Sequence, residues 1–320
     1  MAGRSALGQH FLKKLAGLLF EKLCWSGIKN DMNKIIQKWW PCRPNQEELS
    51  GRLNRFYTEN SAYHAMTAGG SKADHPQVRL LMALVKHGMT YAEVGCGGGE
   101  VSGEVASYAA VRGFDISPIA VNNATQRYGG PKAVFAVAPA ESLPLPESSM
   151  DGAYSFEVLE HLWNPVLALR EMVRVVKPGG FILVSCPNHF SLDLHLRKRP
   201  VVRLVETVCA LARYLQDKLT GAAFLNLTPD IGGPQVYADC DMISSLLPYN
   251  LPGVMRQLGC RLVFLDTFYM CAHGSGHATD LQFQKNSARP FLKWFGDHTL
   301  LLATKGGGDP GRLFNCAWRH

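Results

Sequence analysis

A glycine loop and a carboxylate downstream of it are the first residues whose types suit chemistry. The loop is Gly95-Cys96-Gly97-Gly98-Gly99, and Asp115 stands 20 residues after Gly95. Glycines let the backbone turn tightly and approach a ligand, and the free N–H groups of such a loop suit a polar or anionic ligand. An ionised aspartate accepts two hydrogen bonds, which suits the two hydroxyls of a ribose. The spacing therefore predicts a nucleoside site.

Glu157, Glu160 and His161 form a second group, within the run Glu157-Val158-Leu159-Glu160-His161. Histidine commonly takes up a proton near neutral pH, so His161 is our candidate general base. Glu157 and Glu160 are alternative bases, or supports that orient His161. The other interpretation is a structural histidine that only orients its loop, and the sequence leaves both roles open.

Cys271, His273, His277 and Asp280 raise the question of a metal site. The glycines between the two histidines work against a helix that would pair them, and zinc sites usually show tighter paired spacing. The nine cysteines include no Cys-x-x-Cys pair, which also argues against a disulfide framework or a zinc ribbon. We therefore predict an active-site loop here, with no metal, in a reducing, cytoplasmic protein.

The composition is that of an ordinary globular protein. Its 320 residues are 47% hydrophobic and carry a formal net charge of +7. This length suits one large α/β domain with insertions, or two small domains. No dense Lys/Arg tract resembles a nucleic-acid arm, so we expect no nucleic-acid partner. No apolar run approaches about 18 residues and no secretory signal is visible, so we expect no membrane-spanning helix.

Short strands that alternate with helices must position both groups. The glycine loop follows an apolar strand at 89–94, Asp115 ends a strand at 110–115, and Glu157 follows a strand at 152–156. The other expected elements are helices at 100–110, 118–128, 165–176 and 251–258, and strands at 133–137, 181–185, 261–268 and 298–304, the last two as an antiparallel pair. This alternation predicts a parallel sheet with right-handed crossovers, in which ligands bind beyond the carboxyl ends of the strands.

Two segments outside this alternation have basic amphipathic patterns. The first lies within residues 5–40, where leucines recur at helical spacing among lysines. The second, at 197–215, has four basic residues at its start and an apolar stripe after Pro200. Such helices can lie on an anionic membrane. The alternatives are a helix that caps the catalytic domain or forms a homodimer, and for residues 189–249 a substrate-binding cap.

The run Glu93–Gly99 resembles motif I of the class I S-adenosylmethionine (SAM)-dependent methyltransferases. The likeness continues through Asp115, Leu143-Pro144, Glu157–His161 and Val176–Gly180. It implies a Rossmann-like α/β fold, in which a seven-stranded sheet has helices on both faces, an N-terminal helical extension and a helical insertion after the fifth strand. The implied division is a helical cap at 1–80, a methyltransferase domain at 81–305 with its insertion at 189–249, and a tail at 306–320.

The resemblance also implies SAM as the cofactor and a role for each matched residue. The methionine part of SAM would be cradled by Gly95, Cys96, Gly97 and Gly99, and Glu93 would support its amino group. Asp115 would bind the ribose, and Ile116 would pack on the adenine. Glu141 and Ser142 would lie at the adenine edge, and Phe156 near the methionine end. The family often has an aspartate where this chain has Pro139, so the adenine amine would reach Glu141 or a backbone carbonyl. Tyr63, in the lead-in segment, would close over the ligand, with aromatic packing as the alternative.

The run Glu157–His161 is most similar to the ubiquinone-biosynthesis O-methyltransferases, whose members carry a membrane-associating insertion after the fifth strand. This likeness implies methyl transfer to a small-molecule acceptor, first of all to a hydroxyl of a lipophilic or secondary metabolite, with nitrogen and carbon acceptors as alternatives. A nicotinamide oxidoreductase would have Gly-x-Gly-x-x-Gly, but Glu100 stands at the third glycine position. A non-catalytic SAM-binding protein would share the same motifs.

Overall fold

The computed structural model describes residues 34–35, 37–41, 45–59, 75–191, 200–231, 240–268, 294, 296 and 298–306. The chain divides into two compact units, one formed by residues 1–42 and 192–220 and the other by residues 43–191 and 221–320. The division into 1–80, 81–305 and 306–320 stays a prediction. We describe the larger unit first, because it holds the predicted site.

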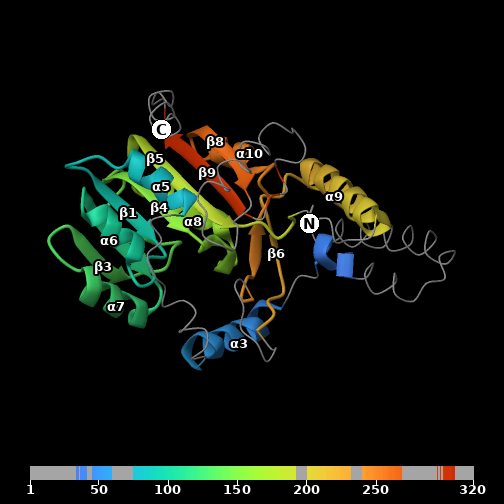
Figure 1. Cartoon of the computed structure of the whole chain (residues 1–320), viewed down its shortest axis with the longest axis horizontal. Coiled ribbons are helices and arrows are strands. Elements are labelled where there is room, and N and C mark those ends of the chain that lie inside the picture. Colours follow the sequence, from blue (N-terminus) through green and yellow to red (C-terminus); the bar gives the residue numbers. More distant parts are fainter. Residues whose placement is uncertain are drawn as a thin grey trace. The chain divides into compact units, whose positions relative to one another are not determined.

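The larger unit is built on a seven-stranded mixed sheet (Figure 1). Its strands are β1 (Thr90–Val94), β2 (Ala110–Asp115), β3 (Ala133–Val137), β4 (Met150–Phe156), β5 (Val176–Pro187), β8 (Cys260–Phe268) and β9 (His298–Lys305). They lie in the order β3-β2-β1-β4-β5-β9-β8. The first five are parallel, and β9 runs antiparallel to both β5 and β8. The predicted parallel sheet and its antiparallel pair are therefore confirmed.

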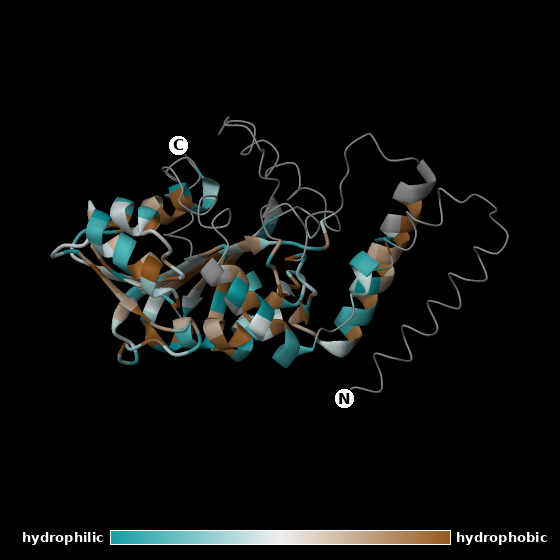
Figure 2. Ribbon diagram, turned by 90° about the horizontal axis from the view of Figure 1, so that it is seen from below, coloured by the Kyte–Doolittle hydropathy of each residue, from teal (hydrophilic) through white to brown (hydrophobic). Residues whose placement is uncertain are grey.

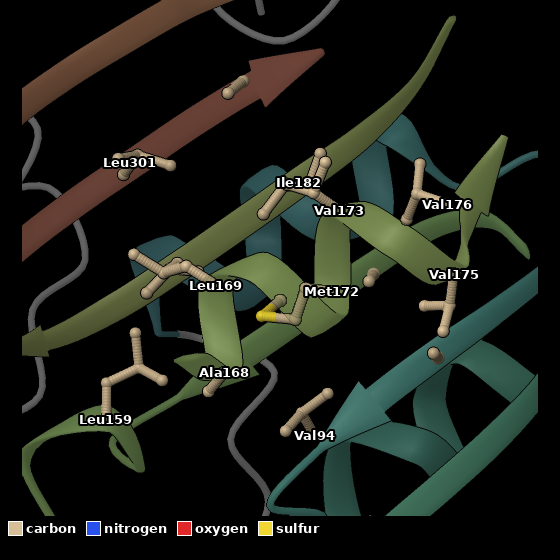
Figure 3. Packing of buried hydrophobic residues seen from close by; sticks show 14 of the residues in the cluster. Val94, Leu159, Ala168, Leu169, Met172, Val173, Val175, Val176, Ile182 and Leu301 are labelled. Carbon is tan, nitrogen blue, oxygen red and sulfur yellow. The ribbon is translucent and has the colours of Figure 1, made fainter. Parts of the chain in front are cut away.

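Helices cover both faces of this sheet, as the resemblance implies. The helices of the larger unit are α3 (Gln46–Glu59), α5 (Pro76–Leu84), α6 (Glu100–Ala106), α7 (Pro118–Tyr128), α8 (Pro165–Val175) and α10 (Leu251–Gln257). One buried cluster joins α5 and α6 to one set of strand side chains, and another joins α8 and α10 to the alternate set. Figure 3 shows Leu169, Met172 and Val173 of α8 packed with Ile182 of β5 within the second cluster. Burial of both faces explains why the strands are nearly continuous apolar runs.

Two predicted helices end earlier than expected because strand pairing takes residues that were assigned to them. The helix expected at 100–110 ends at Ala106, since the Ala110 N–H donates to the Met89 carbonyl at 2.9 Å and Ala110 pairs with Thr90 in the sheet. The helix expected at 165–176 ends at Val175, since Val176 pairs with Met150. Residues 177–180, which follow, thus lie inside β5.

The segment after β5 provides one long helix and a small hairpin. Helix α9 (Pro200–Thr220) belongs to the smaller unit. Strands β6 (Phe224–Asn226) and β7 (Ser244–Leu246) pair antiparallel in the larger unit, where β7 lies against the 3-10 turn η1 (Leu159–His161). Among the described residues, no helix combines the length and the apolar character that crossing a membrane requires.

Within the smaller unit, α9 is held to residues 34–41 by polar contacts. Arg213 Nε donates to Asp217 Oδ2 at 2.7 Å, one turn along the helix, and both side chains are buried. Arg213 Nη1 also donates to the Trp39 carbonyl at 3.0 Å. Trp40 Nε1 donates to Gln216 Oε1 at 2.8 Å. The side of α9 that meets the rest of its unit is therefore partly ionic.

Candidate functional site

The glycine loop is tied to the end of β2 through its backbone. The N–H groups of Gly95 and Cys96 both donate to the Phe114 carbonyl, at 2.7 and 2.9 Å. The Gly97 N–H donates to Asp115 Oδ2 at 2.9 Å, and the Gly99 N–H closes the turn on the Cys96 carbonyl at 2.9 Å. The loop and Asp115 therefore form one hydrogen-bonded unit at the carboxyl ends of β1 and β2.

Glycine is required at two of these positions for different reasons. Gly95 has a φ of +77°, and an added Cβ would lie 2.7 Å from Val158 Cγ1. Gly97 has a φ of +50°, but no atom lies within 4 Å of the place where its Cβ would stand. Gly95 therefore allows the loop to pack closely on the segment after β4. Gly97 leaves open space that a ligand can enter.

Asp115 is more engaged than the sequence suggested. Ser117 caps α7, because its Oγ accepts from the Ala120 N–H at 3.3 Å. Asp115 nevertheless accepts a hydrogen bond at each oxygen, from the Gly97 N–H and, at 2.9 Å, from the Ser117 N–H. Each carboxylate oxygen has a second lone pair for a ligand hydroxyl. Next to it Ile116 is 70% exposed, so its apolar side chain is accessible to a ligand.

These observations show that the residues present fit a nucleoside with a flexible tail. A carboxylate with free acceptor capacity suits the ribose, the exposed Ile116 side chain suits the face of a base, and the space beside Gly97 suits the tail. Glu100, the acidic residue directly after the loop, is paired with Arg127, whose Nη1 lies 3.3 Å from Glu100 Oε1.

Glu93 lies beneath the loop and is buried. Its Oε2 accepts hydrogen bonds from Ser102 Oγ and, at 3.3 Å, from the Tyr154 hydroxyl. Burial and the neighbouring Glu93 charge raise the pKa of Tyr154 well above its ordinary value, so the phenol stays protonated and donates. Tyr154 in turn lies beside Phe156, with ring centroids 5.6 Å apart. The expected contact of Glu93 with an amino group stays a prediction.

Cys96 does not have the properties of a reactive thiol. Its side chain is buried, and burial followed by the nearby Glu93 and Asp115 charges raises the pKa of the thiol. A thiol that stays protonated at neutral pH is a poor nucleophile. The geometry therefore assigns Cys96 to packing and leaves its backbone available to the loop.

The loop that holds Glu141 and Ser142 is fixed by an ion pair on α8 that the sequence analysis missed. Glu171 Oε1 accepts from the Leu143 N–H at 2.7 Å, and Arg174 Nη2 donates to the Leu145 carbonyl at 2.9 Å. Arg174 Nη2 also lies 2.6 Å from Glu171 Oε1, and this hydrogen bond lowers the pKa of the Glu171 carboxyl. Glutamate and arginine three residues apart on a helix are the sequence signal that was available.

Glu157 stands where the chain leaves β4, in the left-handed region with a φ of +57°. Its Oε1 accepts from Ser185 Oγ at 2.7 Å, and its Oε2 lies 3.5 Å from His298 Nε2. Residues in this region of φ and ψ are uncommon and concentrate at functional sites. The structure thus pairs Glu157 with β5 and β9.

His161, at the end of η1, lies between two other carboxylates. Its Nδ1 is 3.3 Å from Asp241 Oδ2, and its Nε2 is 3.7 Å from Glu160 Oε1. The ring is partly exposed, whereas both carboxylates are buried. Glu160 therefore lies beside His161, and its role as a support stays a prediction. Asp241, Ser185 and His298 were missed, because no local motif marks them.

The remaining predicted residues lie outside the described part of the chain. These are Tyr63 and the set Cys271, His273, His277 and Asp280. Among the described residues, no group of three or more His, Cys, Asp or Glu side chains is arranged to hold a metal ion.

A comparison with known protein families matches the part of the chain that contains the glycine loop. The family described as "Methyltransferase domain" matches residues 92–184. A probable S-adenosylmethionine-dependent methyltransferase of Mycolicibacterium smegmatis is 29% identical over 176 residues, 51% of this chain and 68% of the relative. The 2-methyl-6-phytyl-1,4-hydroquinone methyltransferase of Synechocystis is 35% identical over 122 residues, 36% of this chain and 38% of the relative.

A third relative is the 27-O-demethylrifamycin SV methyltransferase of Amycolatopsis mediterranei. It is 32% identical over 145 residues, which are 42% of this chain and 53% of the relative. The chain therefore spans less than two thirds of the length of two of these three relatives. The segment matched by the family contains the glycine loop, Asp115 and His161.

Proposed function

The chain belongs to the S-adenosylmethionine-dependent methyltransferases, and on that premise we propose that it transfers a methyl group from SAM to a hydroxyl group of a small lipophilic molecule. The observation that carries the proposal is the hydrogen-bonded unit of the glycine loop and Asp115, inside the matched segment and at the carboxyl ends of β1 and β2. Relatives named for methylation of a phytyl hydroquinone and of a rifamycin oxygen support an acceptor of this class.

When bound, SAM would supply an electrophilic methyl group on its sulfonium, with the sulfide as the leaving group of an in-line displacement. The chain's own residues would bind and position it: Asp115 would hold the ribose and Ile116 would cover the adenine. The Glu171–Arg174 pair keeps the loop with Glu141 and Ser142 in place. Phe156, whose ring lies beside that of Tyr154, would lie near the methionine part. Holding the two reactants in line accounts for much of the catalysis expected of such a site.

His161 is the proposed general base for the acceptor hydroxyl. It lies on the short turn after β4, and its ring is partly exposed while its carboxylate neighbours are buried. In this role it removes the hydroxyl proton at a ring nitrogen as the methyl group arrives. Glu157, the other predicted catalytic residue, would act by shaping the same edge together with Ser185 and His298.

Labelled methyl transfer with matched probe acceptors tests this function. We would incubate the full chain and methyl-labelled SAM with an alkylated hydroquinone, its amine counterpart, and an alkylbenzene that lacks both groups. The proposal predicts label on the hydroquinone oxygen, and a loss of about 100-fold or more in His161→Gln. Label on the amine or on a ring carbon would contradict the hydroxyl acceptor. SAM binding without transfer to any of a broad acceptor panel would favour the non-catalytic alternative.

The exposed face of α9 supports a membrane-associated setting for this reaction. Leu204, Val208, Leu211, Leu215 and Leu219 are 46–89% exposed. They recur every three or four residues and form one stripe along the helix, whose hydrophobic residues are visible in Figure 2. The opposite side holds the buried Arg213–Asp217 pair. This helix thus presents its apolar side to the outside, the reverse of an ordinary surface helix.

The distribution of charge supports an anionic lipid surface as the occupant. Residues 1–42 and 192–220, which form the smaller unit, contain 13 of the 33 lysines and arginines but 5 of the 26 aspartates and glutamates, a net charge of +8. The remaining 20 basic and 21 acidic residues leave the rest of the chain at −1. An apolar stripe on a positively charged unit suits binding at the surface of an anionic bilayer. A cytoplasmic enzyme bound in this way would meet lipophilic acceptors.

Vesicle flotation tests the membrane contact. Wild-type protein should float with vesicles of phosphatidylcholine and phosphatidylglycerol, and less with phosphatidylcholine alone. Leu211→Ser/Leu215→Ser should reduce flotation, while Val134→Ser, at an exposed apolar residue of β3, should not. Absence of flotation, together with a dimer that the same double substitution dissociates, would show that a second copy covers α9 and would overturn the membrane proposal.

A further inference from the structure

Asp241 is a buried carboxylate that faces the proposed base. Its side chain is 2% exposed, and its Oδ2 lies 3.3 Å from His161 Nδ1. The two residues are 80 positions apart in the chain, and Asp241 comes from the segment inserted after β5. The insertion therefore brings a carboxylate to the edge of the sheet where methyl transfer is proposed.

The position of Asp241 is fixed by hydrogen bonds on both sides of it. The Ile243 N–H donates to the Glu160 carbonyl at 2.9 Å, and Ser244 Oγ donates to the Leu159 carbonyl at 3.0 Å. On the other side, the Cys240 carbonyl accepts from the Asp230 N–H at 2.7 Å. The first two bonds reach the same short turn that carries His161. The carboxylate and the imidazole are thus mounted on two segments that are tied together directly.

The other charged groups around His161 have different geometry. Glu160 Oε1 lies 3.7 Å from Nε2, beyond hydrogen-bond distance. Glu157 is held by Ser185 and lies near His298. Asp241 Oδ2 and His161 Nδ1 are within ion-pair distance, and neither atom has an aligned hydrogen bond. Asp241 is therefore the carboxylate placed to receive a proton-bearing Nδ1, and hydrogen bonds of this kind are often long before substrate binds.

This geometry has a consequence for the tautomer of the ring. A neutral imidazole carries its proton on one nitrogen, and the other nitrogen is the base. A carboxylate facing Nδ1 favours the tautomer with the proton on Nδ1, which leaves Nε2 unprotonated. It also stabilises the imidazolium that forms when Nε2 takes a proton.

We propose that Asp241 is a positioning residue for His161: it holds the ring in the Nδ1–H tautomer so that Nε2 receives the proton of the acceptor. This inference rests on the proposed function in one respect only, the use of His161 as the base. It makes the insertion after β5 a part of the catalytic site, because the base is incompletely oriented without it.

The test is the tautomer of His161, measured by NMR on full-length protein with 15N-labelled histidines, at a pH where the ring is neutral. The signal is assigned by its absence in His161→Gln. Wild type should carry its proton on Nδ1. Asp241→Ala should lose this preference, and Asp241→Glu should keep at least part of it. Asp230→Ala, which removes a carboxylate from the same segment, should leave the tautomer unchanged.

An Nε2–H tautomer in the wild type would overturn the proposal, even if Asp241→Ala fails to fold. The same tautomer in wild type and in folded Asp241→Ala would overturn it as well. A calorimetric titration with SAM on the same samples separates this inference from the function. Both Asp241 variants should bind SAM like the wild type, whereas failure of the wild type to bind SAM would refute the proposed function and not the tautomer.

Discussion

Replacing Gly95 by alanine should destabilise the fold more than the same change at Gly97, and the difference follows from their surroundings. Both glycines have positive φ, at +77° and +50°. An alanine Cβ at Gly95 would stand 2.7 Å from Val158 Cγ1 and 2.9 Å from its Cβ, while at Gly97 it would meet no atom within 4 Å. Gly97→Ala is therefore a matched control that introduces the backbone strain without the collision.

The magnitudes can be worked from these two terms. A left-handed conformation costs an L-residue about 1–2 kcal/mol. Removing a glycine also orders the unfolded chain, which offsets about 0.4–1 kcal/mol of this. Gly97→Ala should then lower the free energy of unfolding by about 1 kcal/mol. Overpacking against Val158 adds about 1–3 kcal/mol, so Gly95→Ala should cost roughly 2–4 kcal/mol.

Urea unfolding without ligand, followed by circular dichroism, measures these differences. The collision is isolated by a cycle with Val158→Ala, in which the double variant Gly95→Ala/Val158→Ala should recover about 1–3 kcal/mol of the sum of the single effects. Equal destabilisation by Gly95→Ala and Gly97→Ala would refute the reasoning, because the close approach of Val158 would then contribute nothing. A cycle without coupling would refute it in the same way.

Two further substitutions test the polar contacts. Glu171→Gln should lower the free energy of unfolding by about 2 kcal/mol at pH 7, the usual scale for hydrogen bonds to a charged group. Because the hydrogen bond from Arg174 lowers the pKa of Glu171, the carboxylate stabilises the fold above its unfolded pKa of about 4.3, and this contribution is lost as the pH falls through the folded pKa. Urea unfolding between pH 7 and 3 should thus show a smaller loss in the variant than in wild type, and parallel curves would contradict the assignment. Asp217→Asn removes the carboxylate that pairs with the buried Arg213 and should lower the free energy of unfolding by about 3–5 kcal/mol. The double variant Arg213→Met/Asp217→Leu should lower it by less. The reverse order would show that the pair is not effectively buried.

The sequence predicted the parts of the fold that have local patterns. Most strands of the sheet are short apolar runs bounded by turn residues, and Pro118 and Pro165 mark the starts of α7 and α8. The ends of α6 and α8 were less well predicted. Ala110 and Val176 are compatible with a helix, and only pairing with Thr90 and Met150 across the sheet decides their state.

In the candidate site, too, the residues with a local pattern were predicted and those that depend on tertiary contacts were not. The glycine loop and Asp115 were found because one ligand needs both within a short stretch of chain. The sequence did not predict Glu171, Asp241 and His298 as partners. Each contacts a site residue that lies 28 to 141 positions away in the chain. Asp115 shows the opposite error: it was expected to have its oxygens open, yet it also holds Gly97 and Ser117 through backbone N–H groups that no side-chain pattern reveals.

Calorimetric titration of the full chain with SAM tests the central claim most directly. We predict saturable binding of one SAM per chain, competition by S-adenosylhomocysteine, no heat with NAD, and affinity at least 10-fold weaker in Asp115→Ala, whose loss removes both the ribose acceptor and the tie to Gly97. Folded wild-type protein that binds NAD and not SAM, or that binds SAM equally well without the Asp115 carboxylate, would contradict it.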